Sequence, residues 1–272
     1  MKEVTLQDAQ ELTMTILRDF DEICKKNNLE YWVDYGTLLG TIRHKGFIPW
    51  DDDIDVGMLR EDYNKFIKIA SEELPDDLLL QNIESDEHVE YQWAKIRHKY
   101  SLILEEDSPK YQSGMFIDVF PFDFYDSEVD IRDFRERKKY IKNYKAIYNA
   151  NLKFEKSFKK NIKRLGCKIL KNTILRKNLR DLIIEEKEKI DIKRNKKKFI
   201  GLGREVFYDL KLIDYEMMFP LKRAKFGNIE VNIPREYDKY LEQTYGSDYM
   251  EIPKEKDRYA HNQGLFIGKK RG

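Results

Sequence analysis

The sequence predicts an α+β fold in which helices flank a sheet and a basic helical segment interrupts the chain. In residues 5–27 apolar residues recur at helical spacing and form a single buried stripe. Short apolar runs that are typical of strands follow up to residue 121 and return near the C-terminus. We therefore expect a core in residues 1–128, a basic helical insertion in residues 129–200, and a C-terminal part in residues 201–272 that packs back on the core.

Residues 31–56 are expected to form two strands with the start of a helix between them. Residues 31–35 read as a strand, and Gly36 and Thr37 as a turn that opens a helix. In the second strand Ile54 and Val56 share a face and can enter the core. The other expected elements are a helix over residues 60–74, strands over 78–82, 91–98, 101–106 (pairing with the strand before it) and 115–121, a hairpin over 221–226 and 229–233, and a helix over 234–245.

Four aspartates crowd the entrance to the second strand, namely Asp51, Asp52, Asp53 and Asp55. Alternate side chains of an extended strand share a face, so Asp51, Asp53 and Asp55 would lie together. Like charges on one face repel unless a cation lies among them, and Mg²⁺ (or Mn²⁺) prefers oxygen ligands. Acidic clusters in loops are commonly just solvated, and spacing alone leaves that alternative open.

The residues before these aspartates favour a metal site. Gly36 and Thr37 stand at a strand-to-helix junction, where free backbone N–H groups and the helix dipole favour a phosphate. Arg43 and its neighbours His44 and Lys45 add positive charge in the following loop. A phosphate-binding turn followed by a carboxylate metal site predicts phosphoryl-type transfer from a nucleotide donor.

Three charged residues in the later strands extend this site. Lys95 and Arg97 share one face of a predicted strand and could hold the donor's phosphates, although two such cations are often just solvated. Asp118 is the only charged residue in the apolar run 115–121. A buried acid needs a partner, so Asp118 is either capped by backbone or an arginine, or is a third metal ligand or base that faces Asp53 and Asp55. We favour the second interpretation.

A family resemblance accompanies these residues. The segments GTLLG (36–40), RHKG (43–46) and IPWDDDID (48–55) resemble the signature of the LicD family, which includes choline-phosphate transferases and is related to fukutin-type ribitol-phosphate transferases. The likeness covers residues 30–120 and 215–262. It implies a nucleotidyltransferase (polymerase-beta-like) fold with a mixed sheet, in which an acid on a later strand completes the site. Thr37 replaces the usual small second residue of the superfamily's glycine motif.

The resemblance implies transfer of phosphocholine from CDP-choline to a sugar hydroxyl of a cell-surface glycan such as teichoic acid or lipopolysaccharide, with release of CMP. Asp53 and Asp55 would hold the metal, Asp51 would join its shell, and Asp118 would share the metal or accept a proton. The positive groups that would stabilise the donor's charge are Arg43, Lys95 and Arg97.

Choline is a quaternary ammonium, so an aromatic cage is expected around it. Tyr35, Trp50 and Trp93 are the candidates. His261 is a further candidate because the family often has a histidine nearby. Two alternatives to this function remain: a nucleotidyltransferase or CDP-polyol-dependent transferase on the same site, and a non-enzymatic protein that binds a membrane or polymer through its basic region.

The distribution of charge points to an anionic partner. Residues 131–200 contain 25 lysines and arginines against 8 acidic residues, whereas the whole chain has a net charge of +1. This segment is either a set of long solvated surface helices packed on the core, or a basic platform that contacts an anionic membrane or a phosphate-rich polymer. The glycan acceptor is expected to be lipid-linked, and no motif indicates nucleic-acid binding. Two cysteines without metal spacing, no signal-peptide pattern and no apolar stretch of membrane-spanning length predict a cytoplasmic protein, peripheral at most to the inner face of the plasma membrane.

Overall fold

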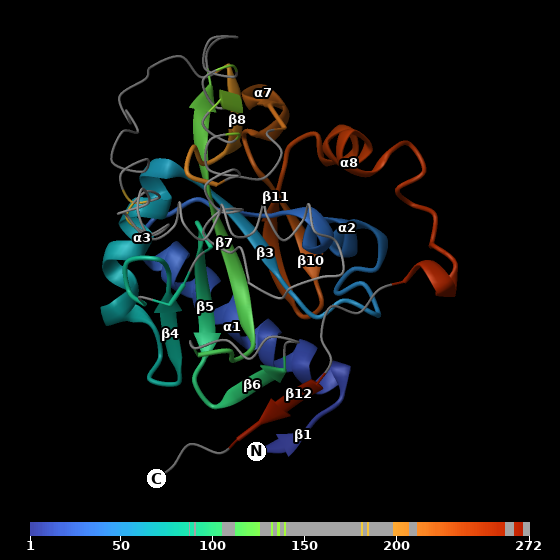
Figure 1. Ribbon diagram of the computed structural model, residues 1–272. Coiled ribbons are helices and arrows are strands. Elements are labelled where there is room, and N and C mark those ends of the chain that lie inside the picture. Colours follow the sequence, from blue (N-terminus) through green and yellow to red (C-terminus); the bar gives the residue numbers. More distant parts are fainter. Residues whose placement is uncertain are drawn as a thin grey trace, which may run out of the picture.

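The computed structural model describes residues 1–86, 88–89, 91–104, 112–125, 198–206, 211–258 and 264–268, together with the single residues 132, 135, 136, 139, 181 and 184. In this part of the chain, helices flank a mixed sheet, which confirms the predicted α+β class (Figure 1). The predicted basic insertion falls almost wholly outside the described residues.

The structure has the helices and strands expected in the described residues, with some bounds shifted: the strand expected over 31–35 is only Trp32–Val33, and Tyr35 already begins a helix. The helices are α1 (Leu6–Lys26), α2 (Tyr35–Arg43), α3 (Arg60–Glu73), α7 (Tyr215–Met218), α8 (Tyr237–Tyr245) and the short 3₁₀ turn η1 (Glu255–Asp257). The strands are β1 (Lys2–Glu3), β2 (Trp32–Val33), β3 (Asp55–Leu59), β4 (Leu78–Gln81), β5 (Ala94–His98), β6 (Ser101–Leu104), β7 (Phe116–Tyr125), β8 (Phe199–Leu202), β9 (Ile213–Asp214), β10 (Lys222–Phe226), β11 (Ile229–Ile233) and β12 (Gly264–Ile267). None of the helices described here is long and apolar enough to cross a bilayer.

The main sheet is built around β7. Its strands follow the order β2-β3-β7-β5-β4, and β8 pairs with the second half of β7 and with β9. β3 and β7 are parallel, whereas the other pairs are antiparallel. The long β7 therefore joins the parallel part of the sheet to its antiparallel part. Asp55 lies in β3 and Asp118 lies in β7.

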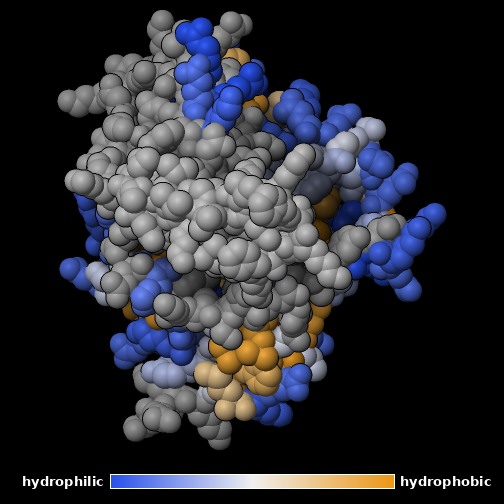
Figure 2. Space-filling model, viewed as in Figure 1, coloured by the Kyte–Doolittle hydropathy of each residue, from blue (hydrophilic) through white to orange (hydrophobic). Residues whose placement is uncertain are grey.

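The strand over residues 101–106 was expected to pair with the strand before it, and this expectation is wrong. β5 is hydrogen-bonded to β4 along one edge and to β7 along the other, so neither of its edges can take β6. β6 pairs instead with β12, which pairs with β1 in a separate small sheet. Apolar residues gather on the surface over this small sheet (Figure 2).

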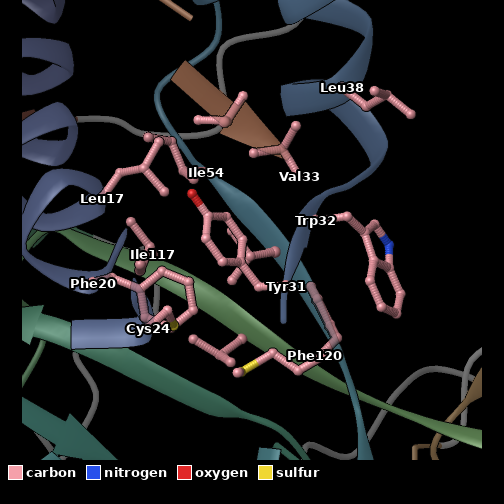
Figure 3. Packing of buried hydrophobic residues seen from close by; sticks show 14 of the residues in the cluster. Leu17, Phe20, Cys24, Tyr31, Trp32, Val33, Leu38, Ile54, Ile117 and Phe120 are labelled. Atoms are coloured by element: carbon pink, nitrogen blue, oxygen red, sulfur yellow. The ribbon is translucent and has the colours of Figure 1, made fainter. Parts of the chain in front are cut away.

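The face of the main sheet that contacts α1 and α3 holds the core. α1 begins after Thr5, whose side chain accepts a hydrogen bond from the N–H of Asp8 while the Asp8 carboxylate accepts one in return, a capping box. Phe20 of α1 makes edge contacts with Tyr31 and with Phe66 of α3, with ring centroids 4.9 and 5.0 Å apart. Tyr31 points toward α1, and the next residue, Trp32, points away from it (Figure 3).

The opposite face packs against α2, and α8 lies beside that helix. The β10–β11 hairpin contacts α2 and β2 and also reaches α1, where Arg223 lies 3.8 Å from Asp21. The Trp32 ring lies over Gly57 of β3, where an added Cβ would stand 2.5 Å from a ring carbon, so this close approach requires glycine. Phe122 of β7 packs edge-on against the same indole ring, with centroids 4.8 Å apart. This face also carries the aspartates of β3 and β7.

A buried ionic network ties α3 to the far end of β7. Arg60 is 6% exposed, and its guanidinium donates to the carboxylate of Asp123 at 2.8 Å and to that of Glu205 at 2.6 Å. Both acids are buried as well, and Asp123 also accepts the backbone N–H of Arg204 at 2.8 Å. The network therefore holds the segment after β8 against β7 and α3.

Truncating Arg60 should destabilise the fold strongly, because two buried carboxylates would lose their main cationic partner. We expect Arg60→Ala to lower the free energy of unfolding by about 3–5 kcal/mol, measured by denaturant titration. Lys65→Ala removes a cation from the exposed side of the same helix and should cost less than about 1 kcal/mol. Equal effects of the two substitutions would show that the buried network contributes no more than a surface pair.

Candidate functional site

Three charged residues form a row across three neighbouring strands. Asp55 of β3 is the register partner of Asp118 of β7, and Asp118 is in turn the partner of Lys95 of β5. The Lys95 ammonium donates to Oδ1 of Asp118 at 2.5 Å, and the indole N–H of Trp93 donates to the same oxygen at 2.5 Å. Side chains at paired positions point to the same face of a sheet, so the pairing alone brings these groups together.

Burial and mutual repulsion dominate the electrostatics of this row. Burial raises the pKa of Asp118, and Lys95 opposes that shift. Burial lowers the pKa of Lys95, with Asp118 opposing. The pKa of Asp55 lies well above its ordinary value because of burial and because of the charges of Asp53 and Asp118. One cation therefore faces several carboxylates, and the site carries an excess of negative charge.

Asp51 and Asp53 join the row from a loop. β3 begins only at Asp55, so Asp51 and Asp53 lie in the loop before the strand, whereas the sequence predicted one strand over all three. The three carboxylates still lie near one another, because the charge of Asp53 contributes to the raised pKa values of both Asp51 and Asp55. Burial, followed by the charge of Asp53, raises the pKa of Asp51 to about 8. Ile54, between these acids and Asp55, is fully buried and anchors the loop to the core, as expected.

The start of α2 lies against the same acids. The hydroxyl of Thr37 accepts the backbone N–H of Asp55 at 2.8 Å. A Cβ added at Gly36 would stand 2.9 Å from Oδ2 of Asp51, so glycine allows the helix end to approach the acidic loop. The first N–H groups of a helix have no acceptor within the helix, which makes this end suited to an anion beside the carboxylates.

Asp34 is a site residue that the sequence analysis missed. It is fully buried, caps α2 by accepting the N–H of Tyr35 at 2.8 Å, and accepts the hydroxyl of Tyr240 from α8. Its own N–H donates to the carbonyl of Asp55 at 2.9 Å. Burial raises the pKa of Asp34 to about 6. An aspartate directly before a helix start is a typical N-cap, and that signal could have identified it.

Tyr245, at the end of α8, is a second residue that was missed. Partial burial and the charges of Asp34 and Asp55 raise the pKa of its hydroxyl, with Asp51 and Asp53 adding to the shift. Tyr245 is 41% exposed as a whole residue, although its hydroxyl group is partly buried. No local pattern in the sequence marks this tyrosine among the 17 in the chain.

Two of the predicted cations are engaged elsewhere. Arg97 is 1% exposed, and its guanidinium donates to the side chain of Gln81 at 2.5 Å and to the carbonyl of Gly114 at 2.7 Å. Arg43 donates to the carbonyls of Tyr249 and Glu251, at 2.8 and 3.0 Å. Of the three predicted cations, Lys95 is the one that these contacts show bound directly to an acid of the site, Asp118.

Two of the three aromatic residues expected around choline pack against the same ring. The Phe120 ring has the Tyr35 ring at 5.8 Å and the Trp93 ring at 5.1 Å, measured between centroids. The Lys95 ammonium lies 5.7 Å from the Trp93 centroid, and the guanidinium of Arg258 lies 4.6 Å from that of Trp50. The remaining candidate, His261, lies outside the described residues.

A divalent cation fits the chemistry of this acidic group. Asp51, Asp53, Asp55 and Asp118 offer the carboxylate oxygens that Mg²⁺ takes as ligands. The raised pKa values of Asp51 and Asp55 reflect repulsion that a cation would relieve. In the described part of the chain, no three acidic, histidine or cysteine side chains already stand at the spacing of a metal cluster, so a bound ion would have to draw these carboxylates together.

Removing one carboxylate from this group should stabilise the protein when no divalent ion is present. We expect Asp55→Asn to raise the free energy of unfolding by about 1 kcal/mol at pH 7 in a chelator, because one of several repelling buried charges is removed. Denaturant titration gives the value, and Glu30→Gln on the surface should change it by less than about 0.5 kcal/mol. Destabilisation by Asp55→Asn would contradict the repulsion inferred here.

Comparisons with known proteins identify the family of this chain. The LicD/FKTN/FKRP nucleotidyltransferase domain matches residues 28–168. The chain is 31% identical to the lipopolysaccharide cholinephosphotransferase LicD of Haemophilus influenzae, over 96% of this chain and 97% of that protein. It is also 50% identical to the ribitol 5-phosphate transferase FKRP of Homo sapiens over 34 residues, which cover 12% of this chain and 7% of that protein. The chain therefore belongs to the LicD/FKTN/FKRP nucleotidyltransferase-domain family.

Proposed function

We propose that this protein is a metal-dependent phosphotransferase that moves phosphocholine from CDP-choline to a sugar hydroxyl of a cell-surface glycan and releases CMP. The observation that carries the proposal is the row Asp55–Asp118–Lys95, in which two carboxylates and one ammonium meet on one face of the sheet. Similarity along nearly the whole chain to a cholinephosphotransferase that acts on lipopolysaccharide supports this choice of donor and acceptor. Teichoic acid or another lipid-linked glycan is an acceptor of the same class.

Asp53 and Asp55 would hold Mg²⁺ or Mn²⁺, with Asp51 and Asp118 completing the set. When bound, the ion would neutralise the donor's diphosphate and polarise its phosphoryl oxygens. The N–H groups of Gly36 and Thr37 at the start of α2 would bind phosphate oxygens.

Asp118 and Lys95 would act on the transferred group. Two donors fix Oδ1 of Asp118, so the orientation of its carboxylate is set before any ligand binds. Burial raises its pKa, which makes it a stronger base than a solvated aspartate, suited to accept the proton of the attacking hydroxyl. The Lys95 ammonium would stabilise negative charge that develops on the phosphoryl oxygens.

A polyol phosphate is the second candidate for the transferred group. Lysine and arginine side chains already face the rings of Trp93 and Trp50, which are two of the three aromatic residues expected around choline. The short match to a ribitol 5-phosphate transferase points the same way. CDP-choline and CDP-ribitol should therefore be compared directly.

The proposed reaction can be tested with a panel of CDP-linked donors at millimolar Mg²⁺. We expect release of CMP with one donor, and a loss of at least about 10³-fold in Asp53→Asn and in Asp118→Asn, because each removes a charge from the acidic group. Product analysis by chromatography separates the outcomes, and Glu30→Gln serves as the control. Release of pyrophosphate from a nucleoside triphosphate would indicate a nucleotidyltransferase instead. Full activity of Asp53→Asn would favour a binding protein.

Replacing Lys95 tests the role of the ammonium separately. We expect Lys95→Met to keep the fold, because its stem is buried and apolar, and to lower kcat by about 10²–10³-fold. Steady-state kinetics with circular dichroism as a folding check would measure this. A change in KM alone would assign Lys95 to donor binding rather than to stabilisation of the transition state.

A further inference from the structure

A pocket of about 260 Å³ opens beside the acidic site, between β7, α8 and residues 211–213. Its floor is formed by Phe122, Ile213 and Tyr240, which are all buried. Lys211 and Gln243 are exposed residues at its mouth. The pocket thus has an apolar interior and a polar rim that faces solvent.

The pocket lies on the face of β7 that carries the catalytic row. Asp118, Phe120 and Phe122 alternate with the residues of the other face, so all three point to the same side. Four residues of strand separate Asp118 from Phe122, a distance of about 13 Å. Tyr35 joins the two places, because it packs against Phe120 and also lines the pocket. A ribose and two linked phosphates in an extended form would cover this separation.

The walls and rim of the pocket select for a flat ring with a polar edge. Tyr35, Phe122 and Tyr240 present aromatic groups, on which a ring can pack. The amide of Gln243 offers both hydrogen-bond donors and an acceptor, which suits the edge of a nucleobase. Lys211, whose ammonium donates to the carbonyl of Thr244 at 3.3 Å, disfavours a quaternary ammonium here.

The size and the walls of the pocket limit the kind of ligand that it can bind. A cavity of about 260 Å³ is large enough for one six-membered ring with its substituents. A sugar is disfavoured because its hydroxyl groups would face apolar walls without partners.

We propose that this pocket binds the pyrimidine base of the nucleotide donor, with the diphosphate lying over Phe120 toward the acidic row. The inference rests on the proposed function, because it assigns a place to the part of the donor that is not transferred. Tyr240 would serve both sites, since its ring lines the pocket while its hydroxyl donates to Asp34, which caps α2.

Titration with CMP at millimolar Mg²⁺, followed by calorimetry, tests the assignment on the full chain. Gln243→Leu removes the polar edge and should weaken CMP binding at least about tenfold, the loss of one hydrogen bond to a buried base. Thr244→Trp should fill the pocket and abolish measurable binding. Glu242→Gln, on the exposed side of the same helix, should leave the affinity unchanged.

The outcomes separate this inference from the proposed function. If Gln243→Leu and Glu242→Gln bind CMP as the parent does while transfer continues, the base lies elsewhere and the inference is overturned, although the phosphotransferase remains. A rise in the acceptor's KM without a change in CMP affinity would assign the pocket to the glycan, and would also overturn it. If the parent transfers nothing from any donor yet binds CMP through Gln243, the proposed reaction fails and the base site stands.

Discussion

The parallel register between β3 and β7 is the constraint on which the site depends. Backbone hydrogen bonds, including that from the N–H of Asp118 to the carbonyl of Ile54 at 2.8 Å, hold the two strands so that Asp55 stands beside Asp118. A slip of β3 by one residue against β7 would turn Asp55 toward the α1 side of the sheet and bring the fully buried Val56 to the side of Asp118. Hydrophobic packing on one face of the sheet therefore sets the charge geometry on the other.

Ionic contacts and hydrogen bonds at several points offset the repulsion between the neighbouring carboxylates. Lys95 compensates Asp118 directly, but Asp55 keeps a raised pKa. Asp34 links α2, α8 and β3 through its bonds to Tyr240 and Asp55, so the helix that faces the acids is fixed at its first turn. On the other face of β7, Arg60 holds the far end of the strand. A charged site is thereby mounted on rigid elements, which preorganised catalysis requires.

Much of this arrangement could be predicted from the sequence, because it depends on local patterns. The stripe of α1, the turn between β10 and β11, and the apolar partners Ile54 and Val56 all follow from periodicity and turn chemistry. The acid isolated in an apolar strand, Asp118, could be named as a partner of Asp55 for the same reason.

What could not be predicted depends on contacts between distant segments. The edge occupancy of β5, which excludes β6, involves strands from across the chain. Arg97 shares a strand face with Lys95, yet the carbonyl of Gly114 and the amide of Gln81 hold its guanidinium. Asp51 and Asp53 belong to the loop before β3, because the strand that pairs with β7 begins only at Asp55. Tyr245 reaches the acids only because α8 packs beside α2.

The central claim is that carboxylates from two neighbouring strands share one divalent cation, and electron paramagnetic resonance of bound Mn²⁺ tests it most directly. The account predicts one tightly bound ion per chain, with binding weakened at least about tenfold by Asp55→Asn and, independently, by Asp118→Asn. If Asp118→Asn leaves Mn²⁺ binding intact while Asp55→Asn abolishes it, the two strands do not share one cation and the account is contradicted.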